Sequence, residues 1–273
     1  MMKWLILLLI LLALATPVVI AIRWRRRIRK LEEARRDFVA NVSHELRTPL
    51  SVIKGYVETM LDSMPNVEGG SPSTAREARA IPAETQREFL QTIQKHTTRL
   101  EALVNDLLDI SALESQQAKL SFESVSLRAV AGAVTGELTL RASQKGILIA
   151  LEIPFNFPSV RADEQRLHQV ITNLLDNAVK YTPAGGRVTM SARENGAEIE
   201  VCVADNGAGI PPEHLPHIFE RFYRVDKTRS REQGGTGLGL SIVKHIVQVH
   251  GGRVWAESAM GEGSKFFFML PRG

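Results

Sequence analysis

Cysteine is almost absent from this 273-residue chain, since Cys202 is the only one. A single thiol excludes a disulfide framework and a cysteine-ligated zinc site. No lysine directly follows a glycine, so the chain lacks a Walker A phosphate loop. The segment His44–Thr48 reads HELRT, and its threonine stands where a zinc protease needs a second histidine, so HExxH zinc chemistry is excluded as well.

Basic residues are in excess in one short segment only. Residues 23–30, RWRRRIRK, carry six positive charges and no acid, and Lys3 is the only other charged residue before Glu32. Without these seven, 27 of the 34 basic residues remain against 30 acidic ones. The net charge of +4 is therefore a local patch, and we expect no nucleic-acid partner.

Long hydrophobic runs are limited to Trp4–Ile22, which has 19 residues and no charge. At about 1.5 Å per residue, a helix of this length spans the roughly 30 Å hydrocarbon core of a bilayer. The arginine cluster directly after it predicts a cytoplasmic location for the rest of the chain, with only Met1–Lys3 outside.

A cleaved signal peptide is the alternative for this run, because the sequence ALA at 13–15 has the small-x-small form. The apolar run continues seven residues further, however, and a positive cluster follows it. We therefore expect a single-pass transmembrane helix at 1–22 in the inner (cytoplasmic) membrane. Residues 23–36 would form a basic linker whose arginines contact membrane lipid.

The segment from residue 37 to about Asp62 predicts a helix with one buried face. Its apolar residues recur at spacings of three and four, namely Val39, Val42, Leu46, Pro49, Ile53, Tyr56 and Met60. At about 100° per residue, His44 lies roughly 200° from both Val42 and Leu46 and points outward. Thr48 shares its face one turn later, and Glu45 is adjacent. An outward imidazole beside a carboxylate is a nucleophile with a proton acceptor, although most exposed histidines are only solvated.

A second helix is predicted from about Ala83 to Gln117, after a loop at 63–82 that is rich in proline and glycine. A heptad pattern of apolar residues runs along it, consisting of Phe89, Ile93, His96, Leu100, Leu103, Leu107 and Ile110. Two helices of this kind bury little surface alone, and pairing two such hairpins completes a four-helix bundle. We therefore expect residues 37–118 to form a homodimerisation domain.

Beyond about Leu120 the pattern changes to alternating strands and helices, which predicts an α/β layered domain at 119–273. The expected strands are Leu148–Ile153, Arg187–Ala192, Ile199–Ala204 and Lys265–Leu270, and the expected helices are Leu127–Lys145, Asp163–Tyr181 and Gly237–His250.

The helix expected at Asp163–Tyr181 has a polar face of unusual composition. Asn173, Asn177 and Lys180 fall within about 60° of one another, opposite an apolar face. An asparagine carbonyl is a suitable Mg²⁺ ligand, and a lysine can neutralise phosphate. An ordinary amphipathic helix with a polar exterior is the alternative.

Two glycine-rich segments follow. Asp205–Ile210, DNGAGI, comes after a strand, and Asp205 could accept the amino group of adenine, although glycines at strand ends commonly just form turns. Gly234–Leu240, GGTGLGL, opens the last long helix, where free amides attract phosphate. Between them Phe219–Arg224 forms an aromatic cluster.

In this order the segments resemble the H, N, G1, F and G2 boxes of the sensor histidine kinases of bacterial two-component systems, and most closely those of the phosphate-regulon type. The resemblance covers about residues 37–273. It implies a C-terminal α/β sandwich of the gyrase/chaperone/histidine-kinase type that binds ATP and Mg²⁺. It further implies a helical-hairpin dimerisation domain, and phosphoryl transfer from ATP to His44 and then to an aspartate of a response regulator.

The resemblance also implies roles for single residues. Glu45 would accept the proton of His44, and Thr48 would orient a water that dephosphorylates the regulator. Asn177 would hold Mg²⁺, and Asp205 would bind adenine. The phosphates would be contacted by Asn173, Lys180, Tyr181 and Arg224. The glycine boxes would complete the ATP site with Gly207, Gly209, Gly235, Gly237, Leu238 and Gly239, under a mobile lid at 211–236.

Two other functions fit parts of the pattern. An ATP-driven clamp of the gyrase/chaperone superfamily would hydrolyse ATP without forming a phosphohistidine. A non-catalytic membrane scaffold would neither hydrolyse ATP nor form a phosphohistidine. The segment around His44 disfavours the first, and the intact asparagines and Lys180 disfavour the second. With so little chain expected outside the membrane, we expect the stimulus to come from the bilayer or from a membrane sensor or transporter protein.

Overall fold

The computed structural model describes residues 2–64, 81–115, 120–226 and 235–273. The side chains of residues 2–23, 26, 27, 30, 31, 34, 35 and 114 lie outside this description. Contacts divide the chain into two compact units, Met1–Ile93 and Gln94–Gly273. Most of the loop predicted at 63–82 and residues 227–234 of the predicted lid are outside the described residues.

Helix α1 spans Met2–Asp62 and ends at the predicted residue. Its predicted buried face is half-buried or buried at Val42, Leu46, Pro49, Ile53, Tyr56 and Met60. Val39 is the exception, because its side chain is 56% exposed. Within the first unit, the Tyr56 ring meets the Phe89 ring of the next helix at 4.8 Å between centroids. The apolar stripe is therefore the packing face of a helical hairpin, as predicted.

Helix α2 spans Ala83–Glu114, three residues shorter than predicted. Its seven predicted heptad positions are all half-buried or buried, with Leu103 and Ile110 fully buried. His96 is half-buried at its heptad position, and burial lowers the pKa of its imidazole, with the nearby charges of Arg99 and Lys95 adding to the effect. This agrees with a packing role for His96.

Where side chains are described, no helix combines the length and the hydropathy needed to cross a membrane. The side chains of Trp4–Ile22 lie outside that description, although their backbone continues α1.

The C-terminal part of the chain contains a five-stranded sheet with the strand order β2-β4-β5-β7-β6. Its strands are β2 Leu148–Glu152, β4 Arg187–Asn195, β5 Glu198–Asp205, β6 Arg253–Ala259 and β7 Gly263–Pro271. Strands β2 and β4 are parallel, and the other pairs are antiparallel. Two short strands, β1 Glu123–Val125 and β3 Val160–Ala162, pair separately. The four predicted strands are confirmed, and β1, β3 and β6 were not predicted.

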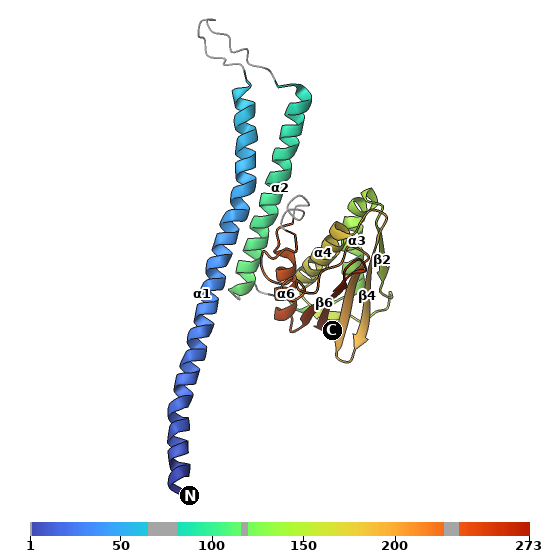
Figure 1. Cartoon of the computed structure of the whole chain (residues 1–273). Coiled ribbons are helices and arrows are strands. Elements are labelled where there is room, and N and C mark those ends of the chain that lie inside the picture. Colours follow the sequence, from blue (N-terminus) through green and yellow to red (C-terminus); the bar gives the residue numbers. More distant parts are fainter. Residues whose placement is uncertain (1, 65–80, 116–119, 227–234) are drawn as a thin grey trace, which may run out of the picture. The chain divides into compact units, whose positions relative to one another are not determined.

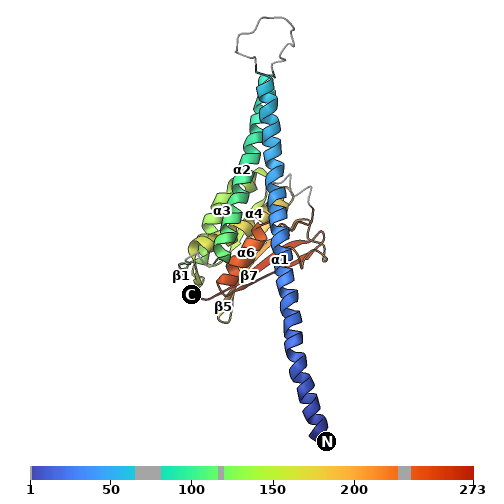
Figure 2. The same cartoon turned by 90° about the vertical axis from the view of Figure 1, so that its left-hand side faces the viewer.

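Three helices cover one face of this sheet, α3 Leu127–Gln144, α4 Glu164–Tyr181 and α6 Gly239–Val249 (Figures 1 and 2). On the three central strands β4, β5 and β7, fully buried apolar residues alternate along the strand, as Ile199, Val201 and Val203 do on β5. On the opposite face Trp255 stacks on Phe267 at 5.0 Å. The predicted α/β sandwich is confirmed.

Candidate functional site

The structure places His44 on the exposed side of α1, where the helical periodicity predicted it. Val42 and Leu46 on either side are half-buried, and Pro49 is buried, so the ring points away from the packing face. Thr48 lies one turn further along and donates its hydroxyl to the backbone oxygen of His44 at 3.2 Å. Glu45, the adjacent carboxylate, is half-buried. The imidazole is thus accessible from solvent and has a hydroxyl and a carboxylate beside it.

Helix α4 presents its predicted polar face away from the sheet. Asp163 caps the helix by accepting the amide of Arg166, and the residues facing the core are fully buried. Asn173, Asn177 and Lys180 lie half-buried on the other face. The amide nitrogen of Asn173 (Nδ2) is buried and has no hydrogen-bond partner among the described residues. A buried donor without a partner costs about 1–3 kcal/mol, so this position suits a ligand that accepts a hydrogen bond.

Lys180 lies in a cluster of positive charge. Burial lowers the pKa of its ammonium group, Asp176 opposes the shift, and the nearby guanidinium groups of Arg224, Arg99 and Arg141 add to it, so that the pKa is about 8. Its Nζ lies 5.3 Å from the centre of the Tyr181 ring. A cation held among other cations and partly out of water favours the arrival of an anion such as a phosphate.

Asp205 is the last residue of β5, the central strand of the sheet. Its carboxylate accepts the amide of Gly207 at 2.8 Å, and burial raises its pKa against the effect of the Gly207 and Ser264 amides. A side chain on Gly207 would meet the Tyr181 carbonyl oxygen at 2.7 Å, so this loop lies directly against the end of α4. Gly209 has φ +75°, and a Cβ there would lie 2.0 Å from the Ala259 oxygen. Only glycine fits both constraints.

The segment 219–224 and the glycine loop 235–239 contact each other through the backbone. The amide of Phe222 donates to the Gly237 oxygen at 2.8 Å, and Arg224 Nη2 donates to the Gly235 oxygen at 2.6 Å. Gly239 packs on α4, since a Cβ there would lie 3.4 Å from Asn173 Oδ1. The loop therefore joins the cluster of Asn173, Lys180 and Arg224 that the sequence predicted.

Leu238 differs from the other predicted ATP contacts. Its side chain is fully buried, and its amide donates to the Thr236 hydroxyl at 3.2 Å. The side chain anchors the glycine loop in the core, so any contact with a nucleotide is left to the backbone of this residue.

The residues present fit ATP and Mg²⁺. The unpartnered Asn173 amide, the cationic cluster and the close backbone approach at the glycines suit a triphosphate. Among the described residues, no group of three or more His, Cys, Asp or Glu side chains converges as a metal site. Asn177 could supply one carbonyl ligand to Mg²⁺, with phosphate oxygens supplying others. Such a site would match the preference of this ion for few protein ligands.

Two family descriptions match the chain and divide the site between them. The His Kinase A (phospho-acceptor) domain matches residues 34–116, which include His44. The family of histidine kinase-, DNA gyrase B- and HSP90-like ATPases matches residues 162–273, which include every predicted ATP contact.

The chain belongs to the bacterial two-component sensor histidine kinases.

Individual relatives agree with this family. The sensor histidine kinase WalK of Bacillus subtilis (strain 168) is 38% identical over 244 residues, which is 89% of this chain and 37% of WalK. The structure of full-length ShkA in complex with AMPPNP is similar with a TM-score of 0.61 and 31% identity, over 87% of this chain and 46% of ShkA. The histidine kinase ThkA, in its structure in complex with the response regulator protein TrrA, is similar with a TM-score of 0.65 and 25% identity. The match covers 87% of this chain and 61% of the matched chain. The chain thus spans well under half the length of WalK. The closer resemblance to kinases of the phosphate-regulon type stays a prediction.

Sequence reasoning missed the residues through which α2 contacts the ATP-binding part of this kinase. Asp106 accepts the Thr236 hydroxyl at 2.8 Å, and Asp109 binds Arg166 and Gln169 of α4. Both acids lie in a leucine-rich stretch of α2, where Leu107 and Leu108 separate them. Helical spacing alone does not show which distant residues such acids contact.

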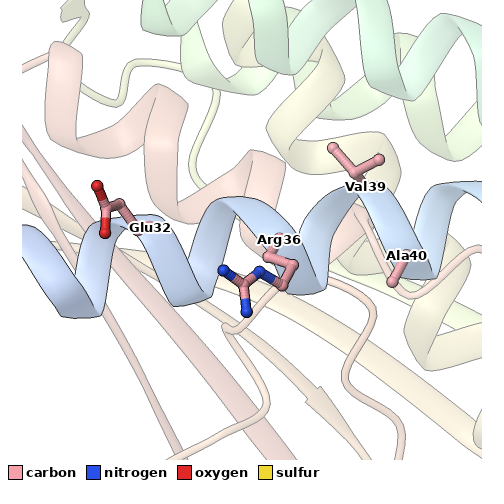
Figure 3. Close-up of a pocket in the computed structure, with 4 residues that line it drawn as sticks. All are labelled: Glu32, Arg36, Val39 and Ala40. Carbon is pink, nitrogen blue, oxygen red and sulfur yellow. The ribbon is translucent and has the colours of Figure 1, made fainter.

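A shallow open hollow lies on α1. Glu32, Arg36, Val39 and Ala40 line it, and Figure 3 shows all four on consecutive turns of the one helix. It contains none of the predicted ATP contacts. Since one side of a single helix cannot enclose a ligand, we assign no binding role to it.

Proposed function

We propose that this chain is a protein-histidine kinase that transfers the γ-phosphoryl group of ATP to His44 and then to an aspartate of a response regulator. One observation carries the proposal: the same chain has an exposed imidazole on a helix and, in its other compact unit, a cluster of asparagines, glycines and cations with the chemistry of a triphosphate site. ThkA, a similar structure, was determined with a response regulator, which supports such a partner here.

In the proposed reaction, a ring nitrogen of His44 forms a bond to the γ-phosphorus. The bond from that phosphorus to the β,γ-bridging oxygen breaks, and ADP leaves with the electron pair. Glu45 accepts the proton from the ring. Lys180 and Arg224 neutralise charge on the phosphates and position them, and Asp205 accepts a hydrogen bond from adenine. When bound at Asn177, Mg²⁺ would supply further neutralisation. Positioning and electrostatics account for most catalysis in phosphoryl transfer.

Labelled ATP distinguishes this function from the alternatives. A histidine kinase acquires an acid-labile, alkali-stable label, and His44→Gln abolishes the label while nucleotide affinity stays the same. A clamp-type ATPase would turn over ATP without becoming labelled, and a scaffold would do neither. Either of these last two outcomes in the unmodified chain contradicts the proposal.

Thr48 supports a second, phosphatase activity. Its hydroxyl lies on the His44 face of α1, one turn away, where it could hold a water next to the aspartyl phosphate of a bound regulator. We expect Thr48→Ala to slow regulator dephosphorylation and to leave His44 labelling unchanged. Unchanged dephosphorylation would refute this role.

The proposed kinase is a homodimer. Besides its packing face, each hairpin helix has a second apolar stripe at heptad-like spacing that is exposed in the single chain, consisting of Leu50, Val57 and Leu61 on α1 and Leu90, Val104 and Leu108 on α2. Pairing two hairpins through these stripes would bury them.

Analytical ultracentrifugation tests the dimer. We expect a chain shortened by residues 1–30 to sediment as a dimer at micromolar concentration. Leu108→Lys, at a position that is 62% exposed, should shift it toward monomer. Leu140→Lys is the matched control, because Leu140 on α3 is 69% exposed and belongs to neither stripe. A monomer without any substitution contradicts the dimer.

We also propose that Trp4–Ile22 anchors the kinase in the inner membrane as a single span, with the catalytic part in the cytoplasm. The apolar run and the six positive charges at 23–30 support this, and Trp24 and Arg25 directly after the run are exposed on α1. Deletion of Trp4–Ile22 should move the protein from the membrane fraction to the soluble fraction. Retention in the membrane would contradict the proposed anchor.

A further inference from the structure

Helices α3 and α4 lie side by side, and the end of α3 contacts the last turn of α4 (Figure 1). Lys145 is the C-terminal cap residue of α3, and its Nζ donates to the backbone oxygens of Val179 and Lys180, both at 3.0 Å. The last four carbonyl groups of a helix have no partner in the helix itself, and α4 ends at Tyr181. Lys145 therefore binds two of these four carbonyls, and its positive charge suits the negative end of the α4 dipole.

The backbone of Lys145 holds the turn that follows α4. Its carbonyl oxygen accepts the amide of Gly185 at 3.0 Å. Gly146, directly after Lys145, has φ +65°, and a Cβ there would lie 3.6 Å from the Gly185 nitrogen, so the two turns are in close contact. The end of α3 thus fixes both the last turn of α4 and the chain that leaves it. Lys180 and Tyr181, to which the proposed function assigns phosphate contacts, extend from this turn.

A second cation of α3 pairs with α4. Arg141 lies one turn before Lys145, and its Nη1 donates to Asp176 Oδ1 at 2.5 Å. The two side chains are 60% and 36% exposed, so the pair adds little to stability. Asp176 is four residues before Lys180 on α4, a spacing at which a carboxylate and an ammonium group attract each other. Arg141 therefore competes with Lys180 for this carboxylate.

The charge of Lys180 depends on this competition. Burial lowers the pKa of its ammonium group, Asp176 opposes the shift, and Arg141 is one of the three guanidinium groups that add to it, so that the pKa is about 8. A carboxylate that is already paired with Arg141 neutralises Lys180 less. The positive charge of Lys180 thus stays available to an anion.

We propose that Lys145 and Arg141, together called the α3 brace, are positioning residues for the nucleotide phosphates. Lys145 fixes the backbone from which Lys180 and Tyr181 reach the phosphates, and Arg141 holds Asp176 so that it does not pair with Lys180. Both residues of the brace act through α4 and need no contact with the nucleotide. The inference rests on the proposed function, which assigns phosphate contacts to Lys180 and Tyr181.

Nucleotide affinity tests Lys145 in the full chain in lipid nanodiscs, and the probe is a fluorescent, non-hydrolysable ATP analogue. Lys145→Met keeps the apolar stem but removes the charge and both hydrogen bonds, so affinity should fall about fivefold or more as the last turn of α4 loses its fixed position. Lys145→Arg retains a charged donor for the two carbonyls and should restore most of the affinity. Lys265→Met is the matched control, because it removes the same charge from an exposed position on β7 and should change affinity little.

The pH dependence of affinity tests Arg141, whose substitution should leave the domain folded because its side chain is 60% exposed. Arg141→Gln frees Asp176 to pair with Lys180, which keeps the lysine charged to a higher pH. With a pKa of about 8, affinity falls about tenfold between pH 7 and 9, and in Arg141→Gln this fall should shrink to about fourfold. Arg141→Lys, which retains the positive charge, should keep the larger fall.

A double substitution isolates the carboxylate. In a chain that carries Asp176→Asn, Arg141→Gln should change the pH dependence less, because no carboxylate is left to free. A role of Arg141 in stability alone would leave the pH dependence unchanged in both backgrounds.

Three results would each refute the α3 brace even when the unmodified chain labels His44. They are a loss of affinity in Lys145→Met no larger than in Lys265→Met, an equally weak binding in Lys145→Arg, and a full pH dependence in Arg141→Gln. If the expected changes occur but the unmodified chain never becomes labelled, the brace stands and the kinase function fails. A chain that binds no nucleotide refutes both.

Discussion

The two regions to which the proposed function assigns the phosphoacceptor and ATP are built in opposite ways. His44 lies on an exposed helical face, and its neighbour Thr48 donates a hydrogen bond to the backbone of the same helix. The ATP cluster is assembled from α4, the end of β5, the segment 219–224 and the glycine loop, and backbone atoms of these parts meet at the glycines. In the proposed function, the phosphoacceptor must be accessible to two successive partners, whereas the triphosphate site depends on preorganised dipoles. Substitutions should therefore have very different consequences in the two regions.

The largest effect on stability is expected in the ATP cluster, from Gly209→Ala. Its positive φ and the approach of Ala259 both exclude a side chain, so strain and overpacking together should destabilise the domain by roughly 2–5 kcal/mol and abolish nucleotide binding. Gly196→Ala is the control. Gly196 also has a positive φ, +65°, but a Cβ there would meet no atom within 4 Å. Its substitution should therefore destabilise the domain by only about 1–2 kcal/mol. Chemical unfolding measures both variants, and equal losses would contradict the close-approach argument.

A smaller effect, on affinity alone, is expected from pH at Lys180. Burial lowers its pKa to about 8 in the free protein, and bound phosphate favours the charged form and raises that pKa. Nucleotide affinity should therefore fall about twofold between pH 7 and 8 and about a further fivefold between pH 8 and 9, as the free protein loses the proton that the complex keeps. Lys180→Arg, which stays charged, should remove this dependence. Titration with a fluorescent, non-hydrolysable ATP analogue measures this pH dependence, and the same slope in Lys180→Arg would contradict the assignment.

The smallest effect, and of opposite sign, is expected in the His44 helix. Gly55 lies within α1, and a Cβ there would meet no atom within 4 Å. Gly55→Ala should stabilise the helix by about 0.5–1 kcal/mol, because alanine loses less backbone freedom on folding. A rise in the melting temperature with His44 labelling unchanged would confirm the contrast between the two regions. A destabilised protein would show that this face of α1 is closely packed in the dimer.

Local patterns predicted much of the fold. Helix α4 begins one residue after the predicted Asp163, which is its cap, and ends at the predicted Tyr181. Helix α1 ends at Asp62 as predicted, and strands β2, β4, β5 and β7 lie where apolar runs predicted them. Strand β6 was missed because RVWAESA, directly after Gly251 and Gly252, mixes charged and small residues without a clear alternation. Short β1 and β3 have too few residues to show a period.

The sequence by itself determined the helical faces, the outward direction of His44 and the residue types of the ATP cluster, because these depend on periodicity and chemistry within about twenty residues. Only the tertiary structure decided that Leu238 is buried and that Asp106 binds Thr236, 130 residues away. Helical spacing shows which residues share a face, but it does not show which distant segment that face meets. That choice depends on how distant segments pack together in the fold, and so the contact between Asp106 and Thr236 became visible only in the folded molecule.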